Sequence, residues 1–327
     1  LQRLYQHIHL LTWTNGNYLY YTKLKTHQLM KKLLIFLVLI LSVVGCSNDN
    51  SQSNSINSMQ SREIEKITNK YYGDSGEAVT YTTTFTYDIL KRITSITEEF
   101  QGDNVTALVE QNITYLADRT IKIVETASYD NEELSTTEIT MTVGLNGYVS
   151  TIDAKCRSIY DYGDTDEWHI EYLYSDLGYL YSDSKKKEYS EYSRQTNQNY
   201  TWKNGNLITI KETETEGEHT YTKHISYNNK VAPNINIDLS RCLPQCLIDA
   251  EVYIPNIGLS NCCIGCTNLF GMKNNNFITN FEDDYEGRTA EFSWTYDIYG
   301  FPIKCICSYY DEEEEFGYQM ISEFEYL

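Results

Sequence analysis

The chain has 327 residues, a formal net charge of −20 and only four prolines. This length allows one large domain or two ordinary ones, with a sizeable hydrophobic core. Such a negative surface repels phosphate backbones, so the composition argues against a nucleic-acid partner.

The chain opens with a segment that we exclude from the mature fold. Residues 1–29 precede the first methionine, Met30, and contain no acidic residue. We interpret them as an upstream extension. Lys31 and Lys32 follow Met30, and an apolar run then reaches Gly45. A basic start, about a dozen apolar residues and a small residue at the end are typical of a secretory signal, predicted here over residues 30–45. The run is short for a membrane-spanning helix, which needs about 20 residues.

The end of this signal carries a sharper motif. Val43-Val44-Gly45-Cys46 resembles the lipobox of bacterial lipoproteins. The resemblance implies that Cys46 becomes the lipidated first residue and anchors the protein to a membrane. Ser47 after the cysteine, in place of Asp, implies the outer membrane. The alternative is an uncleaved N-terminal anchor. Residues 46–63 are rich in Ser and Asn and are predicted to form a flexible tether.

A repeated pattern occupies the rest of the chain, residues 64–327. Each copy has an alternating aromatic strand, a tight turn and an alternating aliphatic strand. The residues at the turn recur 25 to 31 positions apart, which is typical of a repeated supersecondary unit. They are Tyr87, Tyr115, Val143, Tyr174, Trp202 and Tyr227, and Tyr296 marks a further copy.

These copies predict an all-β fold. Thirty tyrosines beside recurrent Thr and Ile favour strands, because β-branched and aromatic side chains fit a pleated surface. Asn204-Gly205 between alternating apolar runs is a strong hairpin signal. We therefore expect an antiparallel meander of about seven repeated hairpins, as a curved sheet or partly closed barrel. Tight turns should lie at one edge and acidic tips at the other.

One segment breaks the period. The distance from Tyr227 to Tyr296 leaves room for an insert of about 40 residues. Asp238–Ala250 and Ser260–Phe270 have partly helical spacing, with Ser260 as N-cap and Gly271 as the stop signal. We predict a short helical insert over about residues 236–275 that covers one face or end of the sheet.

The lipoprotein signal, the Tyr-turn-Ile hairpins and the late insert together resemble an exported lipoprotein family of Bacteroidetes, catalogued as a domain of unknown function. The stretch Leu269–Ile278 resembles the Gly-Lys turn and apolar return strand of that family's insert. The resemblance covers roughly residues 63–327. It implies an exported location and this fold, and it carries no activity or catalytic residues.

Cysteines are the first candidates for chemistry. An exported chain meets oxidising conditions, so disulfides that pin the insert are our first interpretation. Buried thiols, a four-thiolate zinc site and a redox Cys-x-x-Cys remain alternatives. Cys305 and Cys307 lie on one strand face, where one could pair with the insert. The candidate residues are Cys242, Cys246, Cys262, Cys263, Cys266, Cys305 and Cys307.

Aromatic and acidic residues give weaker candidates. Trp202 and Trp294 could stack on sugar rings, but packing within the sheet is our first interpretation. Asp161 to Glu167 offers several oxygens for calcium, but a solvated hairpin tip is our first interpretation. We predict neither a metal nor a cofactor.

The sequence thus predicts a non-enzymatic lipoprotein, anchored to the outer membrane through lipid on Cys46. It would serve binding or a structural part in the cell envelope, with an envelope protein or polysaccharide as partner. The alternative is a surface protein that binds or processes glycans.

Overall fold

The computed structural model describes residues 61–327 except 73–77, 103–104, 131, 159–164, 189–192, 215–219, 241–266, 285–286 and 312–313. Sixteen strands make up nearly all of this part of the chain. They are β1 (Ile64–Tyr72), β2 (Ala78–Tyr87), β3 (Ile93–Gly102), β4 (Val105–Tyr115), β5 (Thr120–Tyr129), β6 (Glu132–Val143), β7 (Val149–Ser158), β8 (Thr165–Tyr174), β9 (Leu180–Glu188), β10 (Ser193–Lys203), β11 (Asn206–Glu214), β12 (Thr220–Val231), β13 (Asn276–Asp283), β14 (Arg288–Tyr296), β15 (Pro302–Asp311) and β16 (Glu314–Tyr326).

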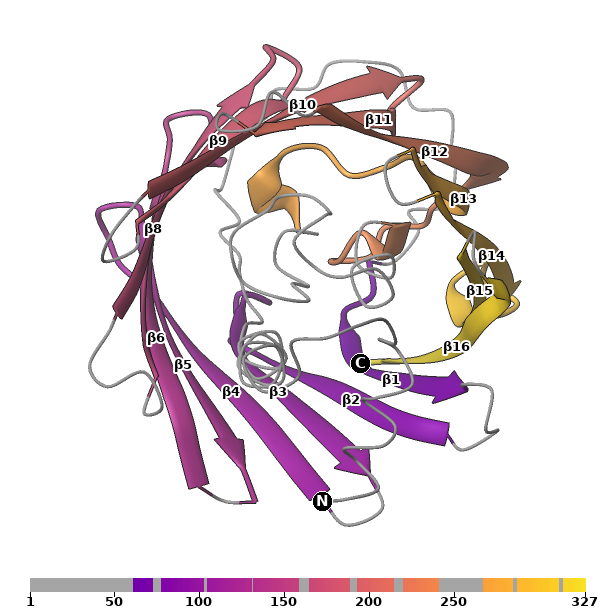
Figure 1. The fold of residues 1–327 in the computed structure, drawn as a ribbon, viewed down its shortest axis with the longest axis horizontal. Coiled ribbons are helices and arrows are strands. Elements are labelled where there is room, and N and C mark those ends of the chain that lie inside the picture. Colours follow the sequence, from indigo (N-terminus) through magenta and orange to yellow (C-terminus); the bar gives the residue numbers. More distant parts are fainter. Residues whose placement is uncertain are drawn as a thin grey trace, which may run out of the picture.

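The strands form one closed barrel (Figure 1). Each strand pairs antiparallel with its neighbours in the chain, and β1 closes the ring against β16, with Ile67 opposite Phe324 and Asn69 opposite Ser322. The predicted all-β antiparallel meander is confirmed. The expectation of seven hairpins and a curved or partly closed sheet is wrong, because the first and last strands supply an eighth pair that completes the ring.

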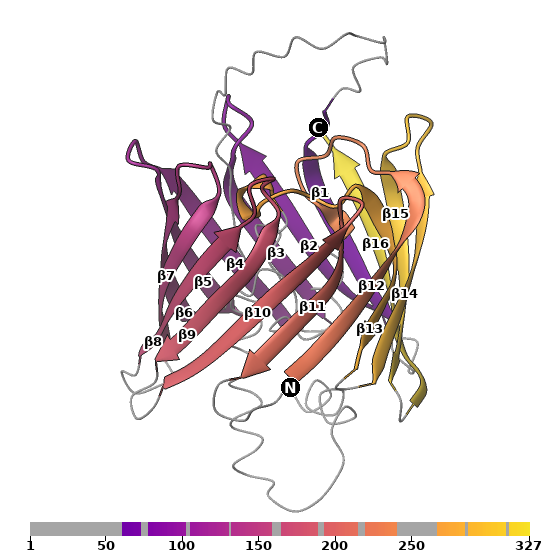
Figure 2. The ribbon, with the colours of Figure 1, turned by 90° about the horizontal axis from the view of Figure 1, so that it is seen from above.

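The two ends of the barrel differ. At one end, which we call the turn rim, short turns follow β2, β4, β6, β8, β10 and β14 (Figure 2). Strand β1 begins and β16 ends at this rim, since Leu327 N donates to Glu63 O. The opposite end, the loop rim, carries the connections that follow the odd-numbered strands. The predicted division of the turns between two edges matches this arrangement.

Aspartates hold the tightest turns. In the turn after β14, Asp297 Oδ1 accepts from Tyr299 N at 2.8 Å and Phe301 N at 2.9 Å. Gly300 in the same turn has φ 89°, which a residue without Cβ adopts freely. Asp88 makes the equivalent bonds after β2. The turn sequence therefore fixes where each hairpin reverses.

The repeated aromatics link each hairpin to its neighbour. Tyr115 at the end of β4 donates its hydroxyl to Ile93 O at the start of β3, at 2.9 Å. Trp202 does the same through Nε1 to Leu180 O, at 2.7 Å. Every even-numbered strand except β6 carries such a donor near its end. The remaining five are Tyr87, Tyr174, Tyr227, Trp294 and Tyr326. This bond explains why the repeat places an aromatic with a polar tip at this position.

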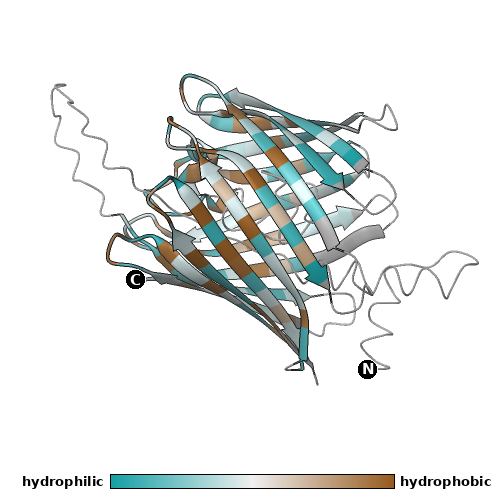
Figure 3. Ribbon diagram, turned by 90° about the vertical axis from the view of Figure 1, so that its left-hand side faces the viewer, coloured by the Kyte–Doolittle hydropathy of each residue, from teal (hydrophilic) through white to brown (hydrophobic). Residues whose placement is uncertain are grey.

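The barrel wall is apolar inside and polar outside. In β6, Ile139, Met141 and Val143 are buried, whereas Glu138 and Thr142 are exposed. Apolar and polar residues also alternate along many of the other strands (Figure 3), whereas buried polar residues such as Glu98, Gln111 and Asp183 interrupt the apolar lumen face on several of them. Lumen-facing side chains from all sides of the ring form a single hydrophobic core cluster.

The described part of the insert fills the turn-rim end of the lumen. Ile235, Ile237, Leu239, Leu269 and Phe270 join the core cluster. In Figure 1 this segment lies inside the ring of strands. We call residues 232–240 and 267–275 the plug.

The plug is fastened by specific contacts. Phe270 meets Tyr172 edge to face, with ring centroids 5.3 Å apart. Asp238 Oδ2 accepts from Asn274 N at 2.7 Å, and Met272 N donates to Gly178 O at 2.9 Å.

The predicted helical character of the insert is not confirmed. The named element in its described part is one 3₁₀ turn, Asn268–Phe270, which Thr267 caps and Gly271 ends. Leu269 and Phe270 pack inside a barrel instead of onto the face of an open sheet. The barrel wall surrounds these side chains, so a long helix is not needed to bury them. Residues 241–266, which carry most of both predicted helices, lie outside the described residues.

Candidate functional site

Polar side chains collect on the lumen face of four consecutive strands, β9 to β12. The register places Asp183 opposite Gln198, and Gln198 opposite Glu212. Tyr200 lies two residues from Gln198 on the same face, and Lys223 follows on β12. We call these five residues the lumen cluster. All are buried except Glu212, whose side chain is 13% exposed.

The lumen cluster is one continuous chain of polar contacts. Tyr200 Oη contacts Asp183 Oδ2 and lies 2.7 Å from Gln198 Oε1. Gln198 Nε2 donates to Glu212 Oε2 at 2.6 Å. Lys223 Nζ pairs with the same oxygen of Glu212 at 3.6 Å. Because the contacts join residues on neighbouring strands or two positions apart on β10, sheet register and strand alternation bring these groups together.

The contacts of Tyr200 indicate where a proton resides. Its hydroxyl has one proton, yet its oxygen is in hydrogen-bonding contact with two acceptors. The donation from Gln198 Nε2 to Glu212 orients the amide so that Oε1 faces Tyr200. The second proton is available when Asp183 is protonated and donates to Tyr200, which then donates to Gln198.

Burial supports the same assignment. Desolvation raises the pKa of Asp183 to about 7, and the charge of Glu212 acts in the same direction. The hydrogen bond with Tyr200 and the charge of Lys185 oppose this shift. Burial also raises the pKa of Tyr200 well above its usual value, so Tyr200 stays a neutral phenol. The cluster is thus able to hold or release one proton near neutral pH.

More buried polar groups face the lumen from the opposite wall. Thr83 Oγ1 donates to Glu98 Oε1 at 3.1 Å, and Gln111 Nε2 donates to Glu125 Oε2 at 2.8 Å. Gln111 Oε1 and Thr137 Oγ1 are buried and make no hydrogen bond within the protein, as is true of Asp183 Oδ1 in the lumen cluster. Such atoms can receive hydrogen bonds from a polar guest in the lumen.

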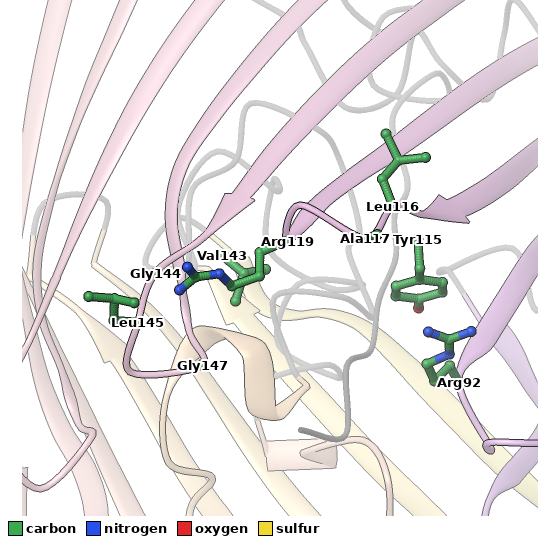
Figure 4. A pocket seen from close by; sticks show the side chains of 9 residues that line it. All are labelled: Arg92, Tyr115, Leu116, Ala117, Arg119, Val143, Gly144, Leu145 and Gly147. Carbon is green, nitrogen blue, oxygen red and sulfur yellow. The ribbon is translucent and has the colours of Figure 1, made fainter. Parts of the chain in front are cut away.

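A second feature lies at the turn rim. A hollow of about 520 Å³ opens between the turns after β2, β4 and β6 (Figure 4). Arg92 sits over the Tyr115 ring, 4.4 Å from its centroid, and its Nη2 pairs with Asp88 Oδ2 at 2.6 Å. Arg119 and the apolar Leu116 and Leu145 complete the lining. The hollow combines cationic and apolar side chains, and therefore suits an amphiphilic anion.

Only part of the predicted cysteine site falls within the described residues. Cys46 and the insert residues Cys242, Cys246, Cys262, Cys263 and Cys266 lie outside the described residues. Cys305 and Cys307 face the lumen on β15 as buried free thiols. Their pairing with the insert stays a prediction. Among the residues that the structure describes, no group of three or more His, Cys, Asp or Glu is placed to hold a metal ion.

We expect Cys305 and Cys307 to be unreactive in the folded protein. Burial raises the pKa of each thiol far above its usual value, so little reactive thiolate is present. A short iodoacetamide pulse should leave both residues unmodified, whereas a pulse in denaturant without reductant should modify both. Peptide mapping by mass spectrometry measures each outcome. Modification in the native state would mean that β15 opens readily, and protection in denaturant would mean a disulfide.

Trp202 and Trp294 lie at the turn-rim ends of β10 and β14 and are half-buried. Each donates Nε1–H to a backbone carbonyl at 2.7 Å. The Trp202 ring packs against Tyr179, with centroids 4.9 Å apart, and the Trp294 ring packs against Phe277, at 4.7 Å. Their rings and N–H groups are engaged within the protein. Stacking of glycans on them stays a prediction.

Sequence reasoning did not find the lumen cluster. The sequence signal nearest to this cluster is the run from Ser182 to Lys187. Every residue in this run is polar, so hydropathy does not show which side of the strand faces the lumen. The inward face became visible only through the pairing of β9 with Tyr172 on β8 and with Gln198 on β10. The acidic loop Asp161–Glu167, predicted as a weak calcium candidate, falls mostly outside the described residues.

Within the described part of the chain, no helix has the length and apolar character needed to cross a membrane.

The fold is similar to that of porin-like proteins. A porin-like protein from Bacteroides uniformis matches with a TM-score of 0.52 and 17% identity, over 81% of this chain and 98% of its own. One from Bacteroides vulgatus matches with a TM-score of 0.49 and 14% identity, over 81% and 99%. No protein-family model matches the chain, and no curated protein matches it significantly. The first of these structures supports the barrel fold.

Proposed function

We propose that the chain is a lipid-anchored protein of the bacterial outer membrane whose barrel stands in water and serves binding without catalysis. The observation that carries this proposal is the polarity of the barrel wall. A barrel that spans a bilayer turns an apolar band about 25 Å tall outward, between two aromatic girdles. This barrel turns its apolar side chains inward.

The magnitude of the mismatch decides against a spanning barrel. Charged residues occupy exposed outward positions in the middle of strands all around the ring. Examples are Glu110, Glu138, Asp153, Lys211 and Glu291. A lysine or arginine facing lipid at the bilayer midplane costs about 2–4 kcal/mol, and an acid somewhat less. The combined free-energy cost of several such residues exceeds the free energy that the scattered outward-facing apolar residues would gain in lipid.

The plug is a second argument against a membrane pore. Phe270 is fully buried and Leu269 nearly so, and both belong to the lumen core at the turn rim. A water-filled channel has a polar lumen. The likeness to porin-like proteins is therefore one of strand arrangement, and we assign no transport activity on that ground.

Membrane attachment then needs a separate device, and the predicted lipid on Cys46 provides one. Several acyl chains on a cysteine give durable anchoring. The resemblance to Bacteroidetes lipoproteins supports the same location. The lumen cluster, with its protonated Asp183, is the binding surface that we favour for a polar partner. No contact of Trp202 or Trp294 favours the alternative of glycan recognition.

Removal of the lipid should release the protein into water. We expect a variant with a cleavable secretory signal in place of residues 30–45 and Ser at position 46 to appear in the periplasmic extract without detergent. The unchanged chain should stay in the membrane fraction. Fractionation, acyl-chain labelling and circular dichroism measure the outcome. A folded variant that remains in membranes and resists carbonate extraction would mean that the barrel itself enters the bilayer.

A further inference from the structure

The exposed large apolar side chains of this barrel gather at one end. Of those in the described residues, all but Val124 lie at the turn rim: in its turns, in the plug, at Leu327, or within two residues of the end of a strand there. The most prominent occupy the tips of the turns, and Ile89, Leu145 and Ile298 are each more than 90% exposed. Leu90, Leu177 and Tyr299 stand beside them.

These side chains do not stabilise the turns. Aspartate side chains and backbone hydrogen bonds hold the reversals, as Asp297 does through Tyr299 N and Phe301 N. A polar residue at the tip would serve the turn equally, since turns favour Asn, Asp, Ser and Gly. Exposed apolar groups concentrated in one place mark an interaction surface.

The loop rim has the opposite character. Its described tips carry exposed acids, among them Asp130, Glu132, Glu133 and Asp284. The turn rim carries cations as well as acids beside its apolar tips: Lys91 bonds Glu63 at 2.9 Å, and Arg119 lines the hollow of Figure 4. An anionic surface would repel the loop rim and accept the turn rim.

We propose that the turn rim docks on the headgroup region of a phospholipid bilayer, with the apolar tips inserted and the hollow beside Arg119 facing lipid phosphate. The tips are separate points spread from the turn after β2 to the turn after β14, so the partner must be flat and wide. A bilayer satisfies this, and its interface takes up isolated Leu, Ile and Tyr side chains beside cations.

Chain connectivity allows the same rim to face the membrane. Arg62 enters the barrel at the turn rim, where it bridges Ile235 and pairs with Asp297. Only residues 47–61 separate it from Cys46, and a chain of that length reaches at most about 55 Å. In this respect the inference rests on the proposed lipid anchor. The polar wall limits insertion to the tips, so the barrel rests on the bilayer without entering it.

Vesicle binding of the unlipidated protein tests this docking apart from the anchor. The soluble variant with Ser at position 46 is mixed with sedimenting vesicles of phosphatidylethanolamine and phosphatidylglycerol. We expect it to bind, and the triple substitution Ile89→Ser, Leu145→Ser, Ile298→Ser to lower the partition coefficient at least about tenfold. Val124→Ser, which removes the exposed apolar residue of the outer wall, is the matched control and should bind as the parent does. Arg119→Gln should weaken binding to these vesicles more than binding to purely zwitterionic vesicles, whose phosphates are accompanied by a headgroup cation.

Each outcome separates the two proposals. A soluble parent that does not bind vesicles overturns the docking and leaves the proposed function intact. Equal binding by the parent and the triple variant also overturns it, as does a rim that captures a protein but no vesicle. A parent that is insoluble without detergent overturns the proposed function instead. The circular dichroism and melting temperature of the triple variant should equal those of the parent, because the three side chains are exposed.

Discussion

Replacement of Phe270 by alanine is expected to lower the free energy of unfolding by about 3–5 kcal/mol. Phe270 is fully buried and belongs to the lumen core. Its ring meets Tyr172 edge to face, which adds to the loss from area alone. Truncation leaves a cavity inside a closed ring of strands, and such a ring cannot collapse inward to fill it. The shift of the guanidinium unfolding midpoint measures the effect.

Leu177→Ala is the control for this substitution. Leu177 lies on the turn after β8 near the same plug, and it is 76% exposed. Its truncation should change stability by no more than about 0.5 kcal/mol. If Phe270→Ala behaves like Leu177→Ala, the plug is not part of the cooperative unit of the barrel. The turn-rim end of the lumen could then open without unfolding of the barrel.

Replacement of Asp183 by asparagine is expected to raise stability at pH 8 and leave it nearly unchanged at pH 4. Burial raises the pKa of Asp183 from 3.8 to about 7. The folded state therefore binds a proton that the unfolded state has released between these values. Stability from this group is fully present below about pH 4 and is lost as the pH rises through 7. Asparagine resembles the protonated acid and avoids the loss, which is on the order of 4 kcal/mol.

The comparison is made on the difference between the two proteins at each pH, because other groups titrate in both. Asp176→Asn, on the exposed turn after β8, should give a profile parallel to that of the parent. If the Asp183→Asn variant is less stable than the parent at pH 8, then Asp183 is ionised in the folded parent and is stabilised by Lys185. It would also contradict the proton that we assign between Asp183 and Tyr200.

The fold was predictable to the extent that it depends on local pattern. Alternation and turn chemistry are written in single hairpins, so stretches such as Tyr200 to Ile210 predicted strands and turns that the structure contains. Closure depends on the pairing of β1 with β16, residues far apart in sequence. Nothing local distinguishes an open meander from a ring.

The candidate site was less predictable for a related reason. A buried polar residue is recognised by its neighbours, and the neighbours of Asp183 come from other strands. Alternation in β9 sets Asp183 and Lys185 on the same face as Leu180 only after a shift of register near Ser182. Trp202 and Trp294 drew attention by their chemistry, and their surroundings then explained them as links between hairpins.

The β1–β16 pair has a consequence for how the protein is made. Ile64 pairs with Tyr326, so the ring cannot close until the segment that forms β16 is available. Until then β1 and the growing end each present an unpaired strand edge, which readily adds strands from other molecules. Contacts of such long sequence separation also form slowly. A product truncated before β16 would keep both edges open and should aggregate, so this barrel depends most on chaperones in the interval before the last strand pairs.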